Sequence, residues 1–324
     1  MSGPFFEDLE PGRIFRSSGM TLTDGHAAWF LSVAGDRNPV HIDDTIARRA
    51  GFVRAPLNTA LLAHVAIGHS TAATQEVVAN LFYTNVLFPR PVLPGATLTT
   101  TTRVLGRAET TARLDRPPRG KVLLDIETRD DEGRVVVSMN RTALVRKASR
   151  GDTGADAPVE PAFTNPAELA SALSEWEPLA AVLPQGPPSW LAGAVGAEEL
   201  PDPVVGALEL VRATGNLAKA HRDSRYGQGG HRLVYGGHTL SLAQAALSRR
   251  ITCEHVVVGW QSCSHPAPVF EEDLLTTSVT GFSALHDSES LSLSQIEVET
   301  HTGEGDAIST VQRWTPIVGT APHA

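Results

Sequence analysis

An internal repeat limits what this chain can fold into more than any other feature of its sequence. Pro91–Thr100 and Pro268–Thr277 both begin with Pro-Val and end with Leu-Thr-Thr. Two further pairs of matching segments follow in the same order along the chain. Chance matches would not keep that order, so the sequence predicts two copies of one domain. Those pairs are Gly35-Asp36 with Gly215-Asn216 and Glu127-Thr128 with Glu299-Thr300.

The repeat divides the 324 residues into an N-terminal domain over 1–147, a linker over 148–199 and a C-terminal domain over 200–324. The linker begins with a stretch rich in Gly, Asp and Pro, the composition of a loop. A short helix is expected from Asn165-Pro166 to about Leu179, because Asn is a common N-cap and Pro suits the first helical position.

Hydrophobic periodicity predicts the same element order in both copies: a helix, a long apolar helix, then four strands. A long apolar helix must be buried, and an antiparallel sheet wrapped around it would bury it, so we expect an α+β fold. Two copies joined side by side would also remove a pair of exposed sheet edges. The expected helices are Thr23–Val33, Asn58–Ala72, Val204–Ala213 and His238–Leu247, and the expected strands are Val77–Leu87, Leu98–Leu105, Val122–Arg129, Arg134–Val145, Val256–Gln261, Leu274–Phe282, Leu291–Thr300 and Ala307–Ile317.

Composition narrows the choice of partners and compartment. The net charge of −9 argues against a nucleic-acid partner, since such binding depends on Lys and Arg at phosphates. No apolar stretch is long enough for a membrane span, and the N-terminus lacks the features of a signal peptide. Two cysteines imply no disulfide framework. We therefore expect a cytoplasmic protein with no membrane or nucleic-acid partner.

The most specific motif is Phe30–His41, which reads Phe-Leu-Ser-Val-Ala-Gly-Asp-Arg-Asn-Pro-Val-His and is followed by Ala47. It resembles the signature of the MaoC-like (R)-specific enoyl-CoA hydratases: an aromatic residue, Gly-Asp-x-Asn-Pro, an aliphatic residue, His, and a small residue six positions later. The chain departs from that signature at Ala34, where the family prefers Ser, Thr, Gly or Cys.

Other segments resemble the tandem MaoC-like subgroup that includes mesaconyl-CoA hydratases: Arg54-Ala55-Pro56, Val78–Leu81 and Arg232–His238. The resemblance covers about residues 5–147 and 200–318. It implies a double hotdog fold, with each antiparallel sheet wrapped around a long central helix. It also implies a lyase that adds water reversibly across the α,β double bond of an acyl-CoA or acyl-carrier-protein thioester. No separate cofactor is expected, and the chain would be a monomeric pseudo-dimer or a homodimer.

Asp36 and His41 are the predicted catalytic pair. Hydration needs a base to activate water and an acid to protonate the α-carbon, and two titratable groups around one water can do both. Histidine suits proton transfer because its unperturbed pKa is about 6.5. Pro39 stiffens the turn between them, and Asn38 is expected to support the loop through backbone hydrogen bonds.

The developing enolate oxygen needs hydrogen-bond donors, which the start of a helix supplies. Two helix starts are candidates for binding the substrate carbonyl, one at Asn58 and one at Gly236-Gly237, beside Tyr235. Glycine would allow the backbone to approach a ligand closely. If the halves pair as a pseudo-dimer, the second-half helix is expected to face the Asp36/His41 loop.

The second copy of the motif is damaged. Asn216 stands where the first copy has Asp36, and an amide cannot act as a base. We therefore predict one working site, with the second half mostly shaping the acyl pocket. His221, which corresponds to His41, is a candidate for binding a polar group of the substrate.

Alternatives remain open from the sequence. The motif cannot distinguish water from an amine such as glycine as the nucleophile, and a non-catalytic protein that binds acyl thioesters would share the fold. Asp36 and His41 would then be a structural pair. A zinc site is not expected, because the strand-like Val256–Trp260 separates the two Cys-x-His sequences by roughly 26 Å. Those sequences are Cys253-Glu254-His255 and Cys263-Ser264-His265.

Overall fold

The computed structural model describes residues 3–111, 116–157, 159, 165–183, 195–196, 200–251, 255–303 and 305–322. Its helices are α1 (Asp24–Ala34), α2 (Pro39–Ile42), α3 (Asp44–Arg49), α4 (Thr59–Ser70), α5 (Pro166–Ser171), α6 (Glu177–Ala180), α8 (Ala207–Ala213) and α9 (Gly236–Arg250). Its strands are β1 (Ile14–Arg16), β2 (Met20–Thr21), β3 (Val77–Leu87), β4 (Thr97–Glu109), β5 (Arg119–Arg129), β6 (Val135–Arg146), β7 (Asp202–Pro203), β8 (Val256–Ser264), β9 (Leu274–Asp287), β10 (Ser292–Thr302) and β11 (Ser309–Thr320).

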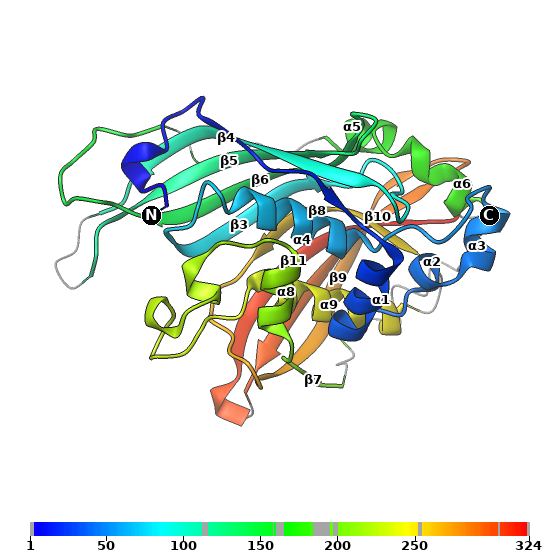
Figure 1. Cartoon of the computed structure of the whole chain (residues 1–324). Helices are drawn as coiled ribbons and strands as arrows, with labels where there is room; N and C mark the ends of the chain where they lie inside the picture. Colours follow the sequence, from blue (N-terminus) through cyan, green and yellow to red (C-terminus); the bar gives the residue numbers. More distant parts are fainter. Residues whose placement is uncertain are drawn as a thin grey trace.

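One antiparallel sheet runs through both copies (Figure 1). Its order is β1-β4-β5-β6-β3-β8-β11-β10-β9-β7, with β2 paired to β4. The two copies meet where β3 pairs with β8, in a register that sets Tyr83 opposite Cys263 and Val86 opposite Trp260. The junction removes one sheet edge from each copy, as the repeat predicted, and the α+β expectation is confirmed.

The two long helices α4 and α9 pack against each other and against the sheet (Figure 1). α4 is apolar on nearly all sides and almost wholly buried, which is typical of a helix enclosed by a core. His64 of α4 and Ser241 of α9 hold equivalent places, five residues after the start of each helix. Their side chains meet at Nε2···Oγ 2.5 Å, so the pseudo-twofold axis passes close to this contact.

The linker packs against the sheet through Trp176, whose buried indole Nε1–H donates to the Phe88 carbonyl at 2.6 Å. The single helix expected from Asn165 to about Leu179 is in fact α5, a 3-10 turn and α6. The short strands β1, β2 and β7 and the short helices α2 and α3 were not predicted, because they are too brief to show a period. None of the helices in the described ranges combines the length and apolar character needed to cross a bilayer.

Gly68 lets α4 approach the second copy closely. A Cβ at Gly68 would lie 2.0 Å from the Thr214 carbonyl oxygen, which directly precedes the Gly215-Asn216 loop. Backbone cannot move aside as a flexible side chain can. We predict that Gly68→Ala lowers the free energy of unfolding by about 1–3 kcal/mol in urea denaturation.

Gly25 of α1 is the matched control for this substitution. A Cβ there would meet only Thr23 Oγ1, at 3.4 Å, which is ordinary contact. Gly25→Ala should leave stability unchanged or raise it by up to about 1 kcal/mol. Equal effects of the two substitutions would contradict the close approach at Gly68.

Candidate active site

The chain turns sharply after α1 and enters the loop that carries Asp36 and His41. α1 ends at Gly35, whose φ of +70° is a left-handed conformation that favours glycine. Asn38 then caps α2, since its Oδ1 accepts from the Val40 N–H at 3.1 Å, and Pro39 takes the first helical position. The chain therefore holds Asp36 and His41 in one short, well-bonded loop.

The Asp36 carboxylate is buried, with 3% of the residue exposed, and accepts three N–H donors. Oδ1 accepts from the Asn38 backbone N–H at 3.1 Å. Oδ2 accepts from Asn58 Nδ2 at 2.7 Å and from Gln244 Nε2 at 3.0 Å. Such donors satisfy a buried carboxylate and fix its orientation.

His41 is fixed as one tautomer. Its Nδ1 lies 3.2 Å from the Pro56 carbonyl oxygen, which can only accept, so Nδ1 carries the proton. Nε2 therefore has a free lone pair, and it is shielded from solvent without a hydrogen-bond partner in the described part of the chain. Burial lowers the pKa of His41 below its usual value, although the Asp36 charge acts in the opposite direction. His41 is thus a neutral imidazole at neutral pH.

The second half completes this cluster. Gln244 lies in the third turn of α9, and it also bonds Asn58 Oδ1 at 3.0 Å. Asn38 Nδ2 donates to the His255 carbonyl at 2.8 Å. Sequence reasoning missed both contacts with the second half. An available signal for Gln244 was its polar amide in a run that is otherwise small or apolar, Leu242–Leu247.

The candidate substrate-binding residues divide between two places. Asn58 lies at Asp36, where it also caps α4 by accepting from the Ala60 N–H at 2.9 Å. Tyr235, Gly236 and His221 instead line a separate cavity at the second copy. Gly237 is packed against the Tyr235 ring and His64.

α9 does face the Asp36/His41 loop, as expected of the second-half helix, but through Gln244 in its third turn and not through its start. Each long helix begins beside the loop of its own copy, because His41 bonds the Pro56 carbonyl and His221 bonds the Leu233 carbonyl, at 3.0 Å. The opposite helix consequently meets each loop with its later turns, as Gln244 does.

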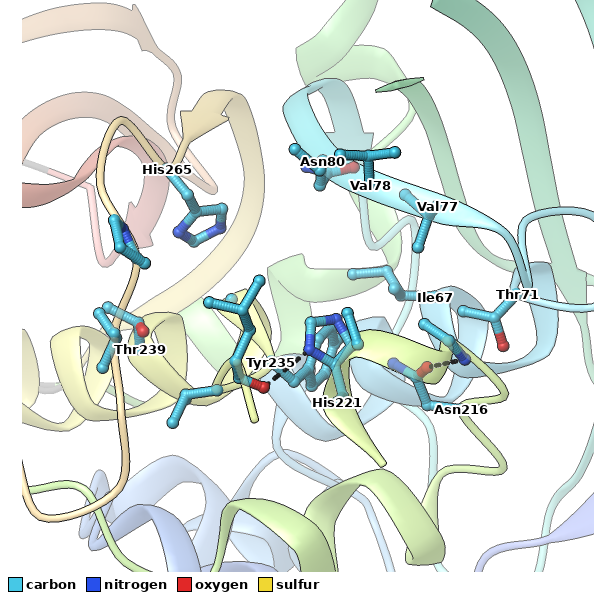
Figure 2. A pocket seen from close by; sticks show the side chains of 18 of the residues that line it. Ile67, Thr71, Val77, Val78, Asn80, Asn216, His221, Tyr235, Thr239 and His265 are labelled. Carbon is cyan, nitrogen blue, oxygen red and sulfur yellow. Dashed lines mark hydrogen bonds between the residues drawn. The ribbon is translucent and has the colours of Figure 1, made fainter. Parts of the chain in front are cut away.

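The cavity at the second copy has a volume of about 240 Å³. Figure 2 shows His265 and Asn80 on one side of it, with Thr239, Tyr235 and His221 on the other. Asn216 keeps one contact of Asp36, since its Oδ1 accepts from the Ala218 N–H at 2.9 Å as Asp36 Oδ1 accepts from the Asn38 N–H, but an amide stands in place of the carboxylate. The cavity thus lies at the damaged motif, and none of its lining residues belongs to the Asp36 cluster.

The first Cys-x-His sequence precedes β8 and the second overlaps its end, and β8 is a strand as expected. Cys253 lies outside the described residues. Within the described ranges, no three His, Cys, Asp or Glu side chains gather in a way that suits a metal ion.

Comparison with known proteins decides the family. A protein-family model described as "MaoC like domain" matches residues 8–115 of this chain. A solved Mycobacterium tuberculosis protein, described as a conserved hypothetical protein with a double hotdog fold, is 31% identical with a TM-score of 0.78, and the match covers 98% of each chain. The chain belongs to the MaoC-like family. The double hotdog fold inferred from the repeat and the motif is confirmed.

Two curated relatives span most of this MaoC-like chain. Mesaconyl-CoA hydratase from Cereibacter sphaeroides is 29% identical over 84% of this chain and 81% of its own length. Beta-methylmalyl-CoA dehydratase from Chloroflexus aurantiacus is 28% identical over 84% and 80%. A MaoC domain protein from Chloroflexus aurantiacus shares the fold, with a TM-score of 0.79, 22% identity, and coverage of 99% of this chain and 98% of that one.

Gln244 should stabilise the fold through the charge on Asp36. We predict that Gln244→Leu lowers the free energy of unfolding by about 1–3 kcal/mol, the usual range for losing a hydrogen bond to a buried charged group. In an Asp36→Asn background the same substitution should cost less, because no charge remains to be stabilised. Urea unfolding of the four proteins measures the coupling. An equal cost in both backgrounds would refute the role assigned to Gln244.

Proposed function

We propose that this MaoC-like protein catalyses reversible hydration and dehydration across the α,β bond of an enoyl thioester, with Asp36 and His41 as its acid/base pair. One observation carries the proposal. A buried carboxylate with fixed orientation and a neutral histidine with a free, shielded Nε2 belong to one loop of the family motif. Both curated relatives are named for this class of reaction.

In the hydration direction, His41 Nε2 accepts a proton from the attacking water while Asp36 accepts a hydrogen bond from that same water. The oxygen bonds to the β-carbon, and the electron pair of the double bond moves toward the thioester carbonyl. The imidazolium then returns the proton to the α-carbon, so the substrate gains one H and one OH. Dehydration reverses each step.

The start of α4 is the best candidate for stabilising the enolate oxygen. Thr59 takes the first helical position beside Asn58, where backbone N–H groups have no acceptor within the helix. Its Oγ1 is also buried without a hydrogen-bond partner among the described residues. Donors aimed at a developing oxyanion contribute strongly to catalysis, because removing one such donor typically costs roughly 2.7–4 kcal/mol.

Coenzyme A is the proposed carrier. Both curated relatives are named for coenzyme A thioesters, and each is matched along most of its length. Free CoA thioesters should therefore be turned over without a carrier protein.

Asp36→Asn and His41→Ala should each lower kcat at least about 100-fold, because each removes a group that moves or orients the proton. The assay follows loss of the enoyl absorbance with a panel of short enoyl-CoA thioesters that includes mesaconyl-CoA. Circular dichroism checks that each variant is folded. Asp131→Asn, in an exposed turn, is the matched carboxylate control and should keep full activity. Full activity in either catalytic variant would overturn the proposal.

The same assay separates the other candidate functions. Mass spectrometry of products formed with and without glycine distinguishes added water from an added amine. Binding of the whole thioester panel without turnover would identify a non-catalytic acyl-binding protein. Because His41 must be neutral to accept a proton, the wild-type rate should fall on acidification with a midpoint below pH 6.5, in line with its lowered pKa.

A further inference from the structure

The cavity at the second copy is separate from the proposed active site. Asn58, which bonds Asp36, and Ile67, which lines the cavity, are nine residues apart along α4, or about 13 Å. Gly236 lines the cavity, whereas Gln244 of the same helix contacts Asp36. The cavity and the Asp36 cluster therefore lie at different positions along the two long helices.

Arg141 of β6 brings a buried positive charge to this cavity, with only 3% of the residue exposed. Its hydrogen-bond partners are neutral: Nε donates to Asn80 Oδ1 at 2.7 Å, and Nη1 donates to Ser70 Oγ at 3.2 Å and to Thr74 Oγ1 at 3.1 Å. The guanidinium also lies 5.9 Å from the centre of the Tyr83 ring. No carboxylate of the described residues forms an ion pair with it. A buried charge without a counter-charge is costly, so an anion bound here would be stabilised.

The register of the strands shows that this charge belongs to one copy alone. Arg141 pairs with Tyr83 on β3, and the equivalent pair in the second half is Pro316 with Trp260 on β8. The equivalence follows from the junction, where Tyr83 faces Cys263 and Trp260 faces Val86 around the pseudo-twofold axis. Proline at the equivalent position means that the Asp36 cluster has no corresponding cation.

The other residues that line the cavity supply hydrogen-bond donors and no carboxylate. The lining residues include neither Asp nor Glu. The Tyr235 hydroxyl and Asn80 Nδ2 are buried without hydrogen-bond partners in the described ranges. Burial lowers the pKa values of His221 and His265 to about 4, so both rings are neutral at pH 7.

We propose that this cavity binds a small free organic carboxylate, with Arg141 as the counter-charge and Asn80 and Tyr235 as hydrogen-bond donors. A cavity of about 240 Å³ has room for an acid of four or five carbons. Its volume lies slightly below the roughly 300–1,000 Å³ that is typical of sites for drug-sized ligands, as a small ligand requires. This second site does not depend on the reaction at Asp36.

Isothermal titration of the full chain with succinate and methylsuccinate tests the proposal, with succinamide as the uncharged analogue. The acids should bind and the amide should not. Arg141→Gln should weaken acid binding about tenfold or more, since it removes the charge that pairs with the carboxylate. Arg129→Gln, an exposed arginine paired with Glu127, is the matched control and should bind as wild type does.

Asn80→Asp provides a second variant that keeps the cation. It places a carboxylate where Asn80 Oδ1 accepts from Arg141, so the protein supplies its own counter-charge and acid binding should be lost. Asp36→Asn should bind the acids normally. Loss of turnover with intact acid binding therefore separates this site from the proposed function.

Two further measurements decide where the acid binds. Succinate should raise the pKa of the His221 ring in NMR titrations, because a bound anion offsets the Arg141 charge that lowers it. Methylsuccinate should leave the KM for enoyl-CoA unchanged. Equal binding of acid and amide, no acid binding to the folded wild type, or competition with enoyl-CoA would each overturn the proposal.

Discussion

The contact between Asp36 and Gln244 is the interaction on which the site depends. It joins a carboxylate of the first copy to an amide from the third turn of the second copy's long helix. A buried carboxylate that loses a donor is unfavourable, so the contact between the two halves stabilises the loop beyond what the donors of the first copy supply. The continuous sheet through β3 and β8 and the packing of α4 on α9 maintain that arrangement.

Duplication preserved the backbone of the site and changed its chemistry. Gly35 and Gly215 both end a helix with a positive φ, at +70° and +66°, and each copy's histidine bonds a carbonyl before its long helix. Side chains then diverge. The first copy has a carboxylate held by amides, whereas the second has Asn216 and a cavity beside Arg141. One fold thus presents the proposed proton-transfer site and a pocket for which we propose an anion.

Much of the fold was predictable because its signals are periodic or repeated. The long strand Val77–Leu87, the first part of the strand Leu274–Asp287 as far as Phe282, and the apolar α4 follow from hydrophobic pattern. The loop of Asp36 and His41 follows from a contiguous motif. Contacts between residues far apart in sequence carry no such pattern, which is why Gln244 was missed and the sequence did not show which turn of α9 meets the Asp36/His41 loop. The charge of Arg141 in the core was hidden for the same reason, since its burial depends on strand register.

A structure of the Asp36→Asn variant with an enoyl-CoA bound tests the central claim most directly. The account predicts the β-carbon within reach of His41 Nε2 and residue 36, with the thioester carbonyl at the start of α4 and the Arg141 cavity free of the acyl group. An enoyl group bound beside His221 and Asn216, away from His41, would contradict it.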